Sequence, residues 1–129
     1  MFTFVGLGNA ATPACTATEK NADFSADNGS EDTATVSANV DAVGDLVAIT
    51  AYCYTSCTFA SVTLGGQTAT KTSVFGPGIS GSPGTGQGAI FYVLSATASG
   101  SQTLTLTVSG SHTDVQTSYI DFSPSAGCK

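Results

Sequence analysis

Hydrophobic and polar residues alternate along most of the chain from residue 33 onward, which predicts a series of β-strands. The clearest segment is 102–109, where Leu104, Leu106 and Val108 alternate with threonines. A similar alternation in 45–54 places Val47 and Cys53 on one face of a strand and Tyr52 on the other. The predicted strands are 33–40, 45–54, 57–64, 67–75, 89–96, 102–109 and 114–122, preceded by a short apolar strand at 2–7.

Two longer stretches show no such period. Residues 8–32 are polar and acidic and are interpreted as a connection, and the Gly/Pro-rich residues 76–88 are interpreted as a loop. Gly65-Gly66 predicts a tight hairpin, and the apolar run 89–96 predicts a central strand buried on both faces. Strands at short, regular spacing favour an all-β fold, a single antiparallel β-sandwich with about seven or eight strands.

Composition agrees with this fold class and limits the size of the protein. The chain has 129 residues, 41% of them hydrophobic, which suits one domain over 1–129 with its own core. Only 9% of the residues are charged, and much of the polar surface is Thr and Ser. Such a composition suits pleated sheets better than amphipathic helices.

Charge excludes several classes of partner. The formal net charge is −6, and the three lysines, Lys20, Lys71 and Lys129, form no basic cluster in the sequence. Nucleic acid is therefore not an expected partner. No apolar run approaches the roughly 18 residues that span a bilayer, so membrane insertion is not expected. Residues 1–7 are too short for a signal-peptide core, which suggests a domain cut from a longer precursor or export by another route.

The four cysteines indicate an oxidising environment. We favour the pairings Cys53–Cys57, which closes a short loop, and Cys15–Cys128, which ties the two ends of the chain together. A structural zinc site is the alternative, but Cys-x₃-Cys has no second pair nearby and His112 is the one histidine. Disulfides place the protein outside the cell or on its surface.

An acidic stretch inside 8–32 is a candidate calcium site. Calcium binds six to eight oxygen atoms from carboxylates, amides and backbone carbonyls, and the stretch supplies several of them. The spacing does not match an EF-hand, and a solvated loop is the alternative interpretation. No other cofactor is expected. The candidate ligands are Asp23, Asp27, Asn28, Glu31 and Asp32.

Three tyrosines are candidates for carbohydrate binding. Tyr52 and Tyr54 share one face of a predicted strand, and Tyr92 lies on another. Aromatic rings that face solvent can stack on sugar rings, whereas tyrosines packed against the core, with hydroxyls at the rim, are the alternative. A catalytic centre is not expected: His112 has neighbouring Ser and Asp residues, but neighbours on an extended segment point to opposite faces.

Three segments resemble a module found in large secreted bacterial surface proteins: Gly-Asp-Leu-Val-Ala-Ile at 44–49, Ser-Val-Thr-Leu-Gly-Gly-Gln-Thr-Ala-Thr at 61–70 and Ala-Ile-Phe-Tyr-Val at 89–93. The resemblance spans about residues 33–122. It implies an Ig-like or jelly-roll sandwich at the cell surface and carries no catalytic signature.

We therefore expect a non-enzymatic extracellular or cell-surface module for adhesion or ligand binding, with a glycan or a surface protein as partner. The alternative is a structural subunit of an extracellular filament or virion surface. Such a subunit would self-associate through the apolar strand at 2–7.

Overall fold

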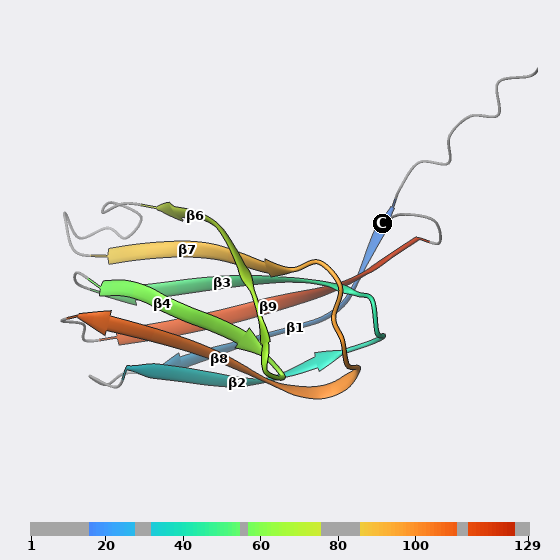
Figure 1. Cartoon of the computed structure of the whole chain (residues 1–129), viewed down its shortest axis with the longest axis horizontal. Coiled ribbons are helices and arrows are strands. Elements are labelled where there is room, and N and C mark those ends of the chain that lie inside the picture. Colours follow the sequence, from blue (N-terminus) through green and yellow to red (C-terminus); the bar gives the residue numbers. More distant parts are fainter. Residues whose placement is uncertain (1–15, 28–31, 55–56, 76–85, 111–113, 126–129) are drawn as a thin grey trace, which may run out of the picture.

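Two antiparallel sheets pack face to face and enclose one hydrophobic core (Figure 1). The computed structural model describes residues 16–27, 32–54, 57–75, 86–110 and 114–125. The first sheet has the strand order β1-β9-β3-β7-β6 and the second has the order β2-β8-β4-β5. The strands are β1 Ala17–Asp27, β2 Thr33–Val40, β3 Leu46–Tyr54, β4 Cys57–Leu64, β5 Gln67–Thr68, β6 Thr70–Phe75, β7 Gly86–Val93, β8 Gly100–Gly110 and β9 Asp114–Pro124.

Alternation along the strands separates the core from the surface, as the sequence pattern predicts. In β3, Val47 and Ile49 are fully buried between the sheets, and Ala48 between them lies on the outer face. In β8, Leu104, Leu106 and Val108 are buried against them. The all-β sandwich is thus confirmed, and no helix of the described residues is long and apolar enough to cross a membrane.

The described residues form nine strands, more than the seven or eight expected. One extra strand is β1, which lies inside the segment 8–32 that we interpreted as a connection. This interpretation is wrong for Ala17–Asp27. The strand pairs with β9 alone, at the edge of the first sheet. Most of its described side chains face solvent, so no hydrophobic period marks it, and backbone hydrogen bonds hold it.

The predicted strand 67–75 is divided between the two sheets. Gly65 and Gly66 adopt φ values of 56° and 85°, which residues with a side chain rarely adopt, and form the predicted hairpin. β5 pairs with β4 in the second sheet, whereas β6 pairs with β7 in the first. The chain crosses from one sheet to the other at the buried residue Ala69, whose N–H donates to the carbonyl of Val62.

Strand β7 differs from its prediction in two ways. It begins at Gly86, inside the predicted loop 76–88, and it ends at Val93. It lies between β3 and β6, but Ile90 and Tyr92 on its outer face are only half-buried, so the strand is not buried on both faces. The predicted strand at 2–7 lies outside the described residues.

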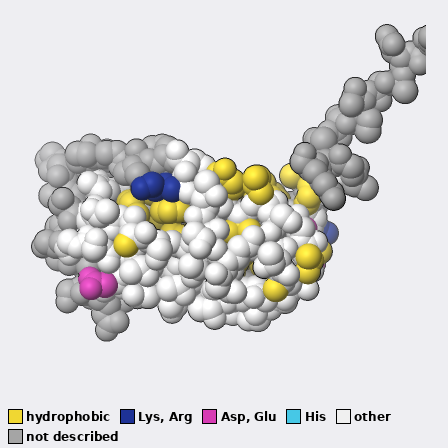
Figure 2. Space-filling model, viewed as in Figure 1, with side chains coloured by type: hydrophobic (Ala, Val, Ile, Leu, Met, Phe, Trp, Pro, Cys, Tyr) yellow, Lys and Arg dark blue, Asp and Glu magenta, His cyan; other side chains and the backbone are white. Residues whose placement is uncertain are grey.

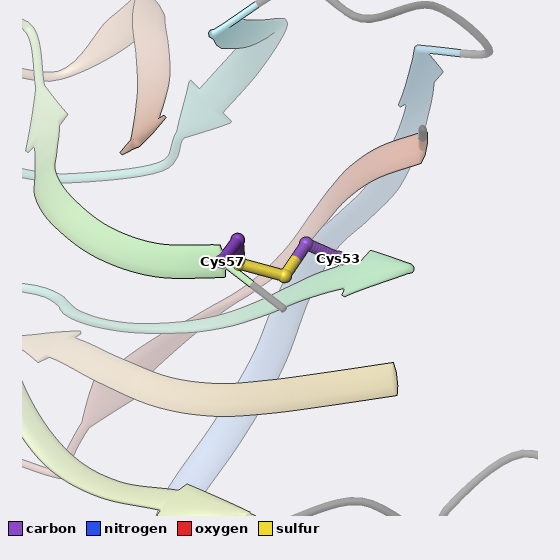
Figure 3. Close-up of a disulfide and its surroundings, with 2 residues drawn as sticks. All are labelled: Cys53 and Cys57. Atoms are coloured by element: carbon purple, nitrogen blue, oxygen red, sulfur yellow. A yellow bond between two sulfur atoms is a disulfide. The ribbon is translucent and has the colours of Figure 1, made fainter. Parts of the chain in front are cut away.

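A disulfide joins the two sheets at one end of the sandwich. Cys53 near the end of β3 and Cys57 at the start of β4 are bonded, with their Cα atoms 6.5 Å apart (Figure 3). Both cysteines are buried, so the bridge forms part of the core. The first predicted pairing is therefore confirmed.

The second predicted pairing, Cys15–Cys128, lies outside the described residues. The residues beside it are adjacent in space: the Ser125 N–H donates to the Thr16 carbonyl over 2.8 Å, and the Thr16 N–H donates to the Ser125 hydroxyl over 3.2 Å. The pairing stays a prediction.

Candidate functional site

The outer face of the first sheet carries the two tyrosines that the sequence analysis placed together. Tyr52 and Tyr54 lie two residues apart on β3, both half-buried, while Ala51 and Cys53 between and beside them point into the core. The two rings therefore share the solvent side of the sheet. The core alternative for these tyrosines does not hold, because the core side of β3 is occupied by other residues.

Two glycines on the neighbouring strand leave room for these rings. Gly86 is paired with Tyr54 and Gly88 with Tyr52, so both glycines are on the outer face beside the tyrosines. The hydroxyl end of Tyr52 lies over Gly86, where a Cβ atom would collide with it. The missing side chain of Gly86 thus lets the phenol of Tyr52 lie across β7.

Polar residues lie on the other side of the tyrosines, on β9. Asp114 is paired with Tyr54 and Gln116 with Tyr52. Asp114 Oδ1 is buried and has no hydrogen-bond partner among the described residues. Further along, the hydroxyls of Thr50 and Ser118 are 2.6 Å apart. A row of aromatic rings beside a row of hydrogen-bonding groups is the arrangement that binds amphipathic, hydroxyl-rich ligands.

The third predicted tyrosine is on the same face but farther away. Tyr92 is paired with Ala48 and follows Gly88 along β7, which places it roughly 13 Å from the level of Tyr52. Ile90, half-buried, lies between them. Tyr119 is 3% exposed and faces the core, where its hydroxyl accepts a hydrogen bond from the Asn39 N–H over 2.8 Å.

Gln116 and the pair Gly86 and Gly88 were not predicted as site residues from the sequence. Gly86 and Gly88 fell inside a Gly/Pro-rich stretch that looked like a loop. Their spacing of two residues, continued by Ile90 and Tyr92, was the signal that they belong to one face of a strand. For Gln116, no signal existed without the register of β9 against β3.

The predicted calcium ligands are only partly described. Asp23 lies on β1 and Asp32 directly precedes β2, and both side chains are exposed. Asp27 is the last residue of β1, and Asn28 and Glu31 lie outside the described residues. Within the described ranges, no group of three or more His, Cys, Asp or Glu side chains is arranged to hold a metal ion. The calcium site stays a prediction.

A polar network at the opposite end of the sandwich connects the two sheets. Asp121, on the core side of β9, is 0% exposed, and its Oδ2 accepts a 2.7 Å hydrogen bond from the Asp41 N–H. Asp41 follows β2 in the other sheet and lies 3.6 Å from the Lys20 ammonium. In the same turn, Asp45 is buried and accepts a hydrogen bond from the Ala42 N–H. The network holds the turn between β2 and β3 against β9.

Burial raises the pKa of Asp121 above its ordinary value of 3.8, because the carboxylate loses its water. The hydrogen bonds from Asp41 and Asn21 oppose this shift, and the negative charge of Asp45 adds to it. The pKa is higher in the folded than in the unfolded chain. The stability contributed by Asp121 is therefore complete at low pH and is lost as the pH rises through the folded pKa.

We expect the free energy of unfolding of the wild type, relative to Asp121→Asn, to be larger at pH 4 than at pH 7. The asparagine keeps the acceptor for the Asp41 N–H but does not ionise. Urea unfolding of both proteins across this pH range measures the difference, in which the other carboxylates cancel. A difference that stays constant, or that grows toward pH 7, would contradict the raised pKa.

Comparison with known proteins adds no relative from which a site could be transferred. No family model, no curated protein and no solved structure matches this chain.

Proposed function

We propose that the protein is a non-enzymatic extracellular binding module whose outer β3–β7–β9 face binds a neutral glycan. The observation that carries the proposal is the placement of Tyr52 and Tyr54 on the solvent side of one strand, with Gly86 and Gly88 on one flank and Asp114 and Gln116 on the other. The rings supply stacking surfaces, and the carboxylate and amide supply hydrogen bonds to sugar hydroxyls.

The shape and charge of the face favour a linear, uncharged chain. The face is the exposed surface of a sheet, and Tyr92 lies on it farther along β7, so a ligand that contacts all three tyrosines must be extended. Asp114 and the net charge of −6 disfavour anionic polysaccharides. The Cys53–Cys57 bridge suits an oxidising, extracellular setting.

Calorimetric titration with neutral hexasaccharides of glucose, xylose and mannose tests the proposal. We expect binding by the wild type and a loss of about tenfold or more in affinity for Tyr52→Ala or Tyr54→Ala, which corresponds to ~1.4 kcal/mol. Tyr52→Phe keeps the ring and should retain most of the affinity. Thr103→Ala, exposed on the other sheet, is the matched surface control.

A second variant tests the position of the ring rather than its presence. Gly86→Ala adds one methyl group where the Tyr52 hydroxyl end lies, so the ring must move. We expect weaker glycan binding although no contacting side chain is removed. If none of the oligosaccharides binds the folded wild type, or if the alanine variants bind as well as the wild type does, the glycan proposal is wrong.

A further inference from the structure

A second, apolar area lies on the same sheet face, at the end opposite to Tyr54. Leu46 is paired with Phe122, and Ala48 with Ile120. Ile120 is 37% exposed, and Leu94, directly after β7, is 70% exposed. Val43, in the turn before β3, is 66% exposed. We call Val43, Leu46, Leu94, Ile120 and Phe122 the end patch.

The main chain brings the parts of the end patch together. The Gly44 N–H donates to the Ala96 carbonyl, and the Ala96 N–H donates to the Asp45 carbonyl, so the turn with Val43 is joined to the segment with Leu94. Figure 2 shows hydrophobic side chains reaching the surface at this end of the molecule, where β1 begins and β9 ends. Exposed apolar side chains gathered at one end of a sheet are typical of an interaction surface, above all in a chain with so little charge.

We propose that residues 2–7 of the same chain dock on the end patch. Their sequence, Phe-Thr-Phe-Val-Gly-Leu, is uncharged and carries four large or branched apolar side chains, which match an apolar surface. The described chain starts at this end: Thr16 is hydrogen-bonded to Ser125. Glu19 on β1 is paired with Phe122.

The intervening chain is long enough for docking within one molecule. Thr16 lies three residues before Glu19, roughly 10 Å along the strand from the level of Phe122. The linker 8–15 can span up to about 30 Å when extended. A short linker gives an effective concentration in the millimolar range. Docking within one chain is therefore favoured over docking on a second copy at ordinary protein concentrations.

A double-mutant cycle tests the contact directly, with the thermal unfolding midpoint as readout. The segment variant is Phe2→Ser/Phe4→Ser, and the patch variant is Leu94→Ser. We expect each variant to lower the midpoint and the combination to lower it by no more than the larger single effect. The segment variant combined with Thr58→Ala, exposed on the other sheet, should instead be additive.

Light scattering on the same proteins identifies the occupant. We expect light scattering to show a monomeric wild type. In a separate measurement, an apolar dye should fluoresce more strongly with the segment variant, because the end patch is then uncovered. Additive effects in the cycle, or a segment variant that unfolds at the wild-type midpoint, would overturn the proposal. A wild-type oligomer that dissociates in the segment variant would assign the segment to a second copy and overturn docking within one chain. The proposal does not rest on glycan binding: the double-mutant cycle reads thermal unfolding without a glycan, so either proposal can fail alone.

Discussion

Replacing Leu104 with alanine is expected to lower the free energy of unfolding by about 2–5 kcal/mol, the largest single-residue effect that we predict. Leu104 is 0% exposed and lies on β8 opposite Val36 on one side and Leu64 on the other. Its loss leaves a cavity between tightly paired strands, which cannot close it without breaking their register. Since a domain of this size is stable by only about 5–15 kcal/mol, the loss is a large fraction of the total.

Urea unfolding measures this change, and the neighbouring residue gives a matched control. Thr103→Ala alters the next position of the same strand, but its side chain is exposed on the outer face. We expect its effect to stay within about 0.5 kcal/mol. Equal effects of the two variants would show that β8 does not turn its leucines toward the core.

Removing the disulfide with Cys53→Ala/Cys57→Ala is expected to cost about 2 kcal/mol in the chain-entropy model for so short a loop. The bridge joins β3 of one sheet to β4 of the other. Without it the unfolded chain gains conformational entropy, which lowers the free energy of unfolding. Unfolding curves of the wild type and the variant, each with and without a reductant, measure the effect.

The same experiment tests the predicted Cys15–Cys128 bridge. If the Cys53–Cys57 bridge alone is present, the reductant should destabilise the wild type and leave the double alanine variant unchanged. A variant that the reductant still destabilises would contain a second bridge, as the sequence analysis expects. If the wild type has the same unfolding curve with and without the reductant, the Cys53–Cys57 bridge does not stabilise the protein and the prediction is wrong.

Period-two alternation was sufficient to predict several of the strands that contribute to the core. β2, β4 and β8 occur where the sequence predicts them, since burial of one face requires apolar residues at every second position. β1 was missed because an edge strand with exposed polar side chains has no such requirement. The division of 67–75 was also missed, because the alternation continues while the chain changes sheets at Ala69.

The candidate site was predictable only within one strand. Spacing alone placed Tyr52 and Tyr54 on a common face, because side chains two residues apart on a strand point the same way. The flanking residues Gly86 and Gln116 come from strands far away in sequence. Their position depends on the register between strands, which tertiary packing determines.

The pairing of β1 with β9 also bears on when the protein can fold. Thr16 and Ser125, which are hydrogen-bonded, lie 109 positions apart, so β1 leaves the ribosome long before its partner strand. At ordinary rates of synthesis this delay is roughly 5–20 s. During that time β1 has no partner strand in its own sheet, and β3 lacks β9 on one side. The first sheet is therefore completed only after β9 has been made, and until then the backbone groups of β1 and β3 that face β9 have no partner strand.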